Sequence, residues 1–180
     1  MMMPTSSIQP GSARPAAFLD RDGVINVDHG YTHRPERLEF TPTAIEAIRL
    51  LNAANYHVLV VTNQSGVARG LYGIAEVESF HAHMNAALAD AGAHIDAFYY
   101  CPSHPAGTIS EFAIEHEDRK PGAGMIHRAM RDWNVRIEGS FLIGDKPSDA
   151  ESAAAAGIPS LLIPSNTGDL ADAVRKILGH

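Results

Sequence analysis

The chain contains, close to its start, the stretch Ala16-Ala17-Phe18-Leu19-Asp20-Arg21-Asp22-Gly23-Val24. Its first four residues are apolar, which is typical of a buried strand, and the apolar run stops at Asp20. Two carboxylates two positions apart, directly after a buried strand, are costly unless a partner neutralises them. A divalent cation is the natural partner, since Mg²⁺ takes few carboxylates together with water and phosphate oxygens. Taken alone, the same residues also fit an ordinary turn.

Beyond this stretch, short apolar runs alternate with amphipathic segments. Strands are expected at residues 16–19, 57–61, 95–100, 140–144 and 159–163. Between and after the strands, the spacing predicts helices from Thr43, whose Thr43-x-x-Glu46 pattern indicates a capping box, and over 77–91, 121–133, 147–156 and 168–178. This order predicts an α/β fold, a Rossmann-like parallel sheet with helices on both faces.

The composition indicates an acidic globular protein. The 180 residues carry 14 Lys and Arg against 21 Asp and Glu, a formal charge of −7, and 45% of them are hydrophobic. An acidic chain is a poor partner for nucleic acid or an anionic membrane, and no apolar run reaches the ~20 residues that span a bilayer. The single cysteine excludes an internal disulfide. We expect a terminal arm over residues 1–14, one domain over 15–180, and a cytoplasmic monomer without nucleic-acid or membrane partners.

Polar residues gather where the predicted strands end. They are Asp20 and Asp22, the turn Thr62-Asn63-Gln64-Ser65, the pair Arg119-Lys120, and Asp145 with Lys146 and Asp149. Ligands of such sheets bind beyond the carboxyl ends of the strands, so we expect these side chains to meet. The turn can cradle an oxyanion and the two cations can neutralise it. Singly, each set also fits a helix cap, a turn or solvated surface.

Taken together, these motifs resemble those of the haloacid dehalogenase superfamily of phosphatases. Asp20-x-Asp22-Gly23-Val24 matches the first motif, Thr62 the second, Lys120 the third and Gly144-Asp145-x-x-x-Asp149 the fourth. Within that superfamily the segments 18–31, 61–70 and 99–102 are similar to the bacterial D-glycero-D-manno-heptose 1,7-bisphosphate 7-phosphatases. The resemblance covers about residues 16–165, and histidinol-phosphate phosphatase domains carry similar motifs.

The resemblance implies a catalytic set and a metal. Asp20 is expected to attack phosphorus and form an aspartyl phosphate, and Asp22 to act as acid and then base. Thr62 and Lys120 are expected to stabilise the phosphoryl oxygens. Mg²⁺ is expected on the carboxylates of Asp20 and Asp145 and the backbone carbonyl of Asp22. Asp149 is expected to orient these groups rather than to bind the metal.

The resemblance also implies a phosphorylated sugar as substrate, bound in an open site with a minimal cap. No large insertion follows the first or second strand, so the segments 21–40 and 101–118 are expected to form the rim. Arg119 suits the second phosphate, because a guanidinium binds a phosphate through two hydrogen bonds. The expected substrate contacts are Asp28, His29, Gly30, Tyr31, Thr62, Asn63, Gln64, Ser65, Arg119, Lys120 and Lys146.

The chain departs from the family at the loop where zinc-bearing members place their thiolates. Those members carry Cys-x-His, then Cys-x-Cys before Arg-Lys-Pro. This chain offers Cys101, His104, His116 and Asp118, with a single thiol and a different spacing. We therefore expect a loop without zinc.

Two other functions fit parts of the pattern. Histidinol phosphate, or another small sugar phosphate, is an alternative substrate for the same chemistry. A non-catalytic receiver-like domain also carries a phosphoacceptor aspartate, but on a middle strand. Asp20 instead follows the first strand and has Asp22 beside it.

Overall fold

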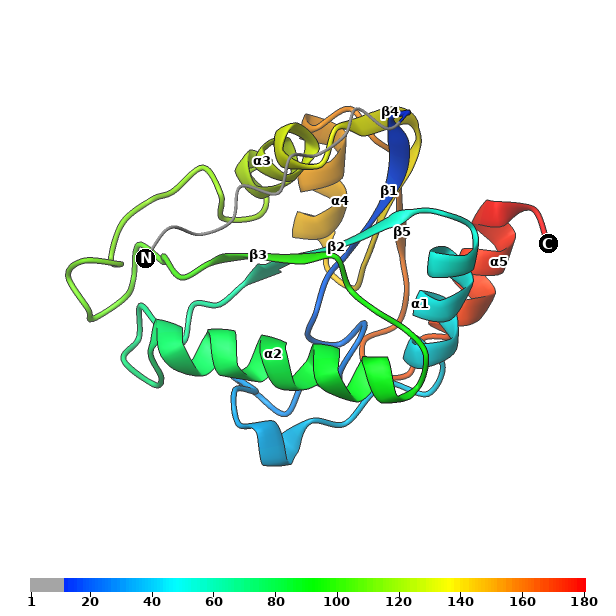
Figure 1. The fold of residues 1–180 in the computed structure, drawn as a ribbon. Helices are drawn as coiled ribbons and strands as arrows, with labels where there is room; N and C mark the ends of the chain where they lie inside the picture. Colours follow the sequence, from blue (N-terminus) through cyan, green and yellow to red (C-terminus); the bar gives the residue numbers. More distant parts are fainter. Residues whose placement is uncertain (1–11) are drawn as a thin grey trace, which may run out of the picture.

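The computed structural model describes residues 12–180 and contains one five-stranded parallel sheet (Figure 1). The strands are β1 (Arg14–Leu19), β2 (His57–Asn63), β3 (Ala97–Cys101), β4 (Val135–Gly144) and β5 (Ser160–Leu162). Their order in the sheet is β3-β2-β1-β4-β5, so the chain runs outward from β1 first in one direction and then in the other. The carboxyl ends of β1 and β4, where this direction reverses, are the position at which such sheets bind ligands.

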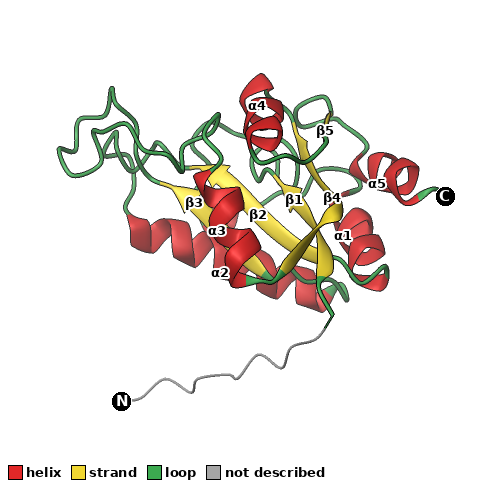
Figure 2. Ribbon diagram, turned by 90° about the horizontal axis from the view of Figure 1, so that it is seen from above, coloured by secondary structure: helices red, strands yellow, loops and turns green. Residues whose placement is uncertain are grey.

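Helices cover both faces of the sheet, as the sequence predicts (Figure 2). They are α1 (Ala44–Ala53), α2 (Ile74–Asp90), α3 (Gly124–Asp132), α4 (Pro147–Ala155) and α5 (Leu170–Leu178), with a 3₁₀ turn at Pro35–Arg37. Successive side chains of a strand point to opposite faces. Accordingly Ala17 and Leu19 of β1 pack in the cluster that contains α1, α2 and α5, and Ala16 and Phe18 pack in the cluster that contains α3 and α4.

Element boundaries differ from the prediction where tertiary contacts intervene. Strand β4 begins at Val135 rather than 140, because Arg14 and Pro15 pair with its first residues. Helix α3 begins at Gly124 rather than 121, because the N–H of Gly124 is bonded to the Glu117 carbonyl of the preceding turn. Residues 1–11 of the expected arm lie outside the described residues, and Arg14 belongs to β1.

The capping box expected at Thr43 is wrong, although α1 begins where it predicts. The Thr43 hydroxyl makes no cap bond to its own helix. It donates to Asp169 at 2.9 Å and accepts the Ala171 N–H at 3.0 Å, so it serves the first turn of α5. A hydroxyl can cap any helix start within reach, and the packing of α1 beside α5 brings this one within reach.

Candidate active site

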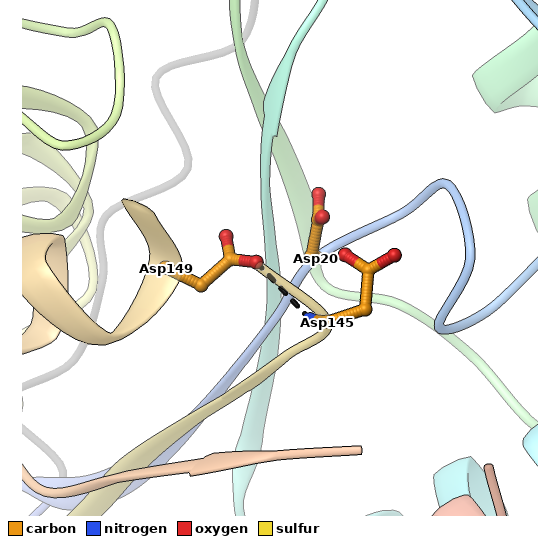
Figure 3. Close-up of side chains that lie close together, drawn as sticks. All are labelled: Asp20, Asp145 and Asp149. Atoms are coloured by element: carbon orange, nitrogen blue, oxygen red, sulfur yellow. Dashed lines mark hydrogen bonds between the residues drawn. The ribbon is translucent and has the colours of Figure 1, made fainter. Parts of the chain in front are cut away.

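Three buried or partly buried carboxylates meet at the ends of β1 and β4. Asp20 directly follows β1, and its N–H donates to the Ile143 carbonyl of β4 at 3.0 Å. Oxygen atoms of Asp20, Asp145 and Asp149 all lie within 4.8 Å of one another (Figure 3). Burial raises the pKa of Asp20 to about 7, Asp149 and Asp145 raise it further, and Lys120 opposes them. This cluster of carboxylates therefore favours the binding of a cation.

Lys120 is the buried cation that faces this cluster. Its Nζ lies 2.9 Å from Asp20 Oδ1 and 2.6 Å from Asp149 Oδ1, and it donates to the Val61 carbonyl at 2.9 Å. Burial opposes its charge, but Asp20 and Asp149 outweigh that effect and raise the pKa of Lys120. Asn63 fixes the backbone of Lys120 from both sides, at 3.0 and 3.1 Å. Both polar atoms of the Asn63 side chain are therefore bonded to the backbone of Lys120.

Asp149 and Asp145 differ in how much of their hydrogen-bonding capacity the protein uses. Asp149 Oδ1 pairs with Lys120, and Oδ2 accepts the backbone N–H groups of Asp145 and Lys146 at 3.1 Å each. Asp145 Oδ1 is buried and has no hydrogen-bond partner among the described residues. A β-carbon at Gly23 would lie 2.4 Å from Asp145 Oδ2, so glycine leaves room for this carboxylate beside the first motif. The free carboxylate oxygen of Asp145 and the carboxylate of Asp20 suit a hard divalent cation.

Asp22 follows Asp20 by two residues and is surrounded by donors. Arg21, fully buried, contacts both of its oxygens at 3.0 and 3.1 Å, and Asn26 and Gln64 each donate at 3.0 Å. Burial would raise the pKa of Asp22, but Arg21 and the hydrogen bonds from Asn26 and Gln64 outweigh it and lower the pKa. In the protein without substrate, Asp22 is thus held as a carboxylate.

The four catalytic residues that the sequence indicates come together around one cavity of about 40 Å³. Its lining comprises Asp20, Asp22, Thr62, Asn63, Lys120, Lys146, Ser148 and Asp149. Thr62 is buried near the end of β2, whereas Lys146 is exposed at the start of α4. Gln64 is buried behind this cavity, and Ser65 lies half-buried in the same turn.

The remaining residues that are expected to contact the substrate lie in two other segments. Asp28, His29, Gly30 and Tyr31 follow the first motif, and part of this segment lines a second cavity of about 310 Å³. Arg119 is half-buried and donates to the Ser103 carbonyl at 3.4 Å, at the base of the 101–118 segment.

The loop residues considered for zinc have protein partners. Cys101 is buried, which raises the pKa of its thiol. His104 accepts the Ala106 N–H and His116 the Asp118 N–H, each at 3.0 Å, and Asp118 pairs with Arg128. Within residues 12–180, the cluster of three or more candidate ligands close enough to share an ion is the one formed by Asp20, Asp145 and Asp149.

The sequence prediction missed three residues that the structure places at the site. Arg21 stands between the two aspartates of the first motif. This position is the sequence signal that could have identified it as a site residue. Ser148 lines the cavity of about 40 Å³ beside Asp20. Asn166 accepts the Asp28 N–H at 2.7 Å and donates its own N–H to the Gly23 carbonyl at 2.9 Å. No local pattern marks Asn166, since its partners are far away in the chain.

The sequence is similar to curated phosphatases over most of its length. It is 50% identical over 146 residues to D-glycero-β-D-manno-heptose-1,7-bisphosphate 7-phosphatase of Rhodopseudomonas palustris, covering 81% of each chain. It is 43% identical over 144 residues to the protein of the same name from Escherichia coli K12, covering 80% of this chain and 75% of that one. The chain belongs to this heptose-bisphosphate phosphatase family.

Residues 118–177 of this family member also match the family described as HAD-hydrolase-like. The protein is therefore a phosphatase of the haloacid dehalogenase superfamily, and the predicted resemblance is confirmed. No helix within residues 12–180 is both long and apolar enough to cross a membrane.

Solved structures of the heptose-bisphosphate phosphatase family have the same fold. D,D-heptose 1,7-bisphosphate phosphatase from B. bronchiseptica, complexed with magnesium and phosphate, superposes with a TM-score of 0.78 at 32% identity, covering 92% of this chain and 98% of that one. The enzyme of that name from Burkholderia thailandensis gives 0.64 at 28% identity, covering 93% and 100%. The predicted Rossmann-like fold of haloacid dehalogenase type is confirmed.

Proposed function

We propose that the protein hydrolyses the C7 phosphate ester of D-glycero-β-D-manno-heptose 1,7-bisphosphate through a phosphorylated Asp20. The observation that carries the chemistry is the carboxylate of Asp20, with Lys120 at 2.9 Å and a free, buried oxygen of Asp145 beside it. The choice of sugar is supported by the names of relatives that are 42–50% identical to the chain.

The proposal includes Mg²⁺ as the metal, held by the carboxylates of Asp20 and Asp145 and the backbone carbonyl of Asp22. The unpartnered oxygen of Asp145 and the excess of acids over cations in the cluster support it. When bound, Mg²⁺ neutralises the repulsion between an anionic nucleophile and the phosphate. We propose a catalytic monomer in the cytoplasm, with no zinc in the 101–118 loop.

In the first step Asp20 attacks phosphorus and the C7 oxygen of the sugar leaves. Lys120, fixed by Asp149 and by the Val61 carbonyl, is placed to stabilise the phosphoryl oxygens together with the Thr62 hydroxyl. The phosphate ester binds as its monoanion and passes its proton to the Asp22 carboxylate, and Asp22 then donates this proton to the departing sugar oxygen. The resulting Asp22 carboxylate, which its surrounding donors favour, then takes a proton from the water that hydrolyses the aspartyl phosphate.

The experiment that tests this proposal is a substrate panel with added Mg²⁺ and with EDTA. It comprises the α and β anomers of the heptose bisphosphate, fructose bisphosphate and histidinol phosphate. We expect the highest kcat/KM on the β anomer, many turnovers per chain, and loss of activity in EDTA. Faster turnover of histidinol phosphate would overturn the substrate assignment. A single phosphorylation without phosphate release would overturn catalysis in favour of a receiver-like role.

A further inference from the structure

Gln64 occupies a position that a substrate contact does not explain. It directly follows β2, but its side chain turns away from solvent and the residue is 1% exposed. Its amide nitrogen donates to Asp22 Oδ2 at 3.0 Å and to Thr62 Oγ1 at 2.9 Å. Its amide oxygen accepts from the Tyr72 hydroxyl at 2.8 Å and from Arg21 Nη2 at 3.3 Å. Both donors and both acceptor positions of the amide are used by the protein.

Tyr72 determines the orientation of the Gln64 side-chain amide, that is, the positions of its oxygen and its nitrogen. Burial raises the pKa of the Tyr72 phenol to about 12, so its hydroxyl remains a donor at neutral pH. A donor at this point requires the oxygen of Gln64, and the amide nitrogen must then face Asp22 and Thr62. A β-carbon at position 66 would lie 2.2 Å from the Tyr72 ring, so Gly66 gives the ring room to cross the turn. The His33 ring stacks on Tyr72 with centroids 4.4 Å apart.

The amide in turn orients two groups of the catalytic cavity. Thr62 Oγ1 accepts a hydrogen bond from Gln64, so the single proton of the Thr62 hydroxyl remains available for donation. Asp22 Oδ2 accepts from Gln64, and this bond holds the carboxylate at the edge of the same cavity. One amide thus fixes both the hydroxyl that faces the phosphoryl group and the carboxylate that exchanges protons with the leaving oxygen.

We infer that Gln64 is a positioning residue for this reaction, whose amide, fixed by Tyr72, sets the Thr62 hydroxyl and the Asp22 carboxylate in place. This role replaces the substrate contact expected at Gln64. The inference rests on the proposed function, because it takes the roles of Thr62 and Asp22 from there.

The test uses aryl phosphates, which carry no sugar for Gln64 to touch. We compare kcat/KM on phenyl phosphate, whose leaving group needs a proton, with kcat/KM on p-nitrophenyl phosphate, whose leaving group needs much less help. Gln64→Glu keeps the size and the acceptor oxygen but removes the donors to Asp22 and Thr62. We expect a roughly 10²-fold loss on phenyl phosphate, at the lower end of what proton transfer by a placed side chain contributes. The loss on p-nitrophenyl phosphate should be clearly smaller.

A residue that only contacts the sugar would leave both aryl phosphates unchanged and lose activity on the heptose bisphosphate alone. That result overturns the inference.

Tyr72→Phe keeps the inference testable if the Gln64 variant does not fold. It removes one hydrogen bond to Gln64 and leaves the ring in place, so we expect a loss of about fivefold with the same leaving-group dependence. The matched control is Tyr56→Phe, which removes a tyrosine hydroxyl bonded to the Gly139 carbonyl far along the sheet from the site. Equal activity of the two variants on both aryl phosphates would overturn the role of Tyr72 and of the amide that it fixes.

Asp22→Asn separates a failure of this inference from a failure of the proposed function. Its loss should grow with the basicity of the leaving group. If it does so while Gln64→Glu loses equally on both aryl phosphates, the assignment of Gln64 is wrong and that of Asp22 stands. If Asp22→Asn shows no such dependence, the proposed role of Asp22 fails and the inference fails with it.

Discussion

The first motif contributes to two buried clusters, and each contains a buried cation paired with one or more carboxylates. In the first, Lys120 faces Asp20 and Asp149, with Asp145 beside them. In the second, Arg21 faces Asp22 alone, and its remaining N–H groups bond to neutral acceptors. These acceptors are the Thr32 carbonyl, Gln64 and His81. The first cluster therefore holds more acid than base, and the second is balanced.

This difference separates the part of the site that suits a cation from the part that orients Asp22. Buried charges persist where they are paired, so a cluster with unpaired acid favours an additional cation. The free oxygen of Asp145 belongs to the first cluster. In the second cluster every polar atom of the Arg21 guanidinium has a protein partner, and the guanidinium also lies 4.6 Å from the Phe80 ring centroid. The first cluster is built to act on a ligand and the second to hold Asp22.

The largest expected effect comes from removing the nucleophile of the first cluster. Asp20→Asn should lower kcat on the heptose bisphosphate by on the order of 10⁴-fold or more, because an amide does not form the covalent intermediate. Steady-state phosphate release measures this loss. The exposed Asp172→Asn serves as the control. Retained turnover in Asp20→Asn would show that Asp20 is not the nucleophile.

The acid excess also predicts a response of stability to magnesium. Mg²⁺ at 100 times its Kd should raise the free energy of unfolding by about 2.7 kcal/mol, and Asp145→Asn should abolish most of this gain. Urea unfolding with Mg²⁺ and with EDTA measures both values. In EDTA the variant should be at least as stable as the native chain, because it loses a carboxylate oxygen that has no partner. A variant that is much less stable in EDTA would contradict the charge comparison.

Arg119 belongs to neither cluster, so its removal should affect substrate choice. Arg119→Ala should lower kcat/KM on the heptose bisphosphate by roughly 10- to 10²-fold, as expected for a lost charged hydrogen bond to phosphate. Small aryl phosphates, which lack a second phosphate, should react nearly as before. Arg119→Lys should recover part of the loss. Equal losses on both substrates would place Arg119 at the transferred phosphate instead.

The second cluster predicts the smallest effect, a dependence of stability on pH. Burial and the neighbouring Arg21 lower the pKa of His81 to about 3 in the folded chain, against 6.5 in the unfolded chain. Between these values the unfolded chain binds the extra proton, so stability falls as the pH falls below 6.5. Lowering the pH from 7 to 5 should cost about 2 kcal/mol through His81.

His81→Gln keeps an acceptor for Arg21 and removes the titration, so the variant should lose about 2 kcal/mol less than the native chain over this pH range. Urea unfolding at both pH values measures the difference, and the same substitution at the exposed His83 of α2 is the control. Equal pH dependence in the native chain and His81→Gln would mean that His81 is not held neutral against Arg21.

The sequence predicts the fold and the main members of the site because both depend on local pattern. Apolar runs of strand length, alternating with helical stripes, specify the parallel sheet. The carboxyl ends of parallel strands share one edge, so residues at predicted strand ends such as Asp20, Thr62 and Asp145 converge. The resemblance to a phosphatase family adds their roles.

The tertiary structure alone decides which polar atoms pair. Lys120 is tied to Asp149 and to the Val61 carbonyl, Asn63 to the Lys120 backbone, and Thr43 to α5 rather than to its own helix. The pairing of Gln64 is also decided by the tertiary structure, since its side chain turns inward to Asp22 instead of outward to the rim. Each of these bonds depends on the distance between segments far apart in the chain. Strand and helix periodicities do not encode such distances, whereas the packed sheet does.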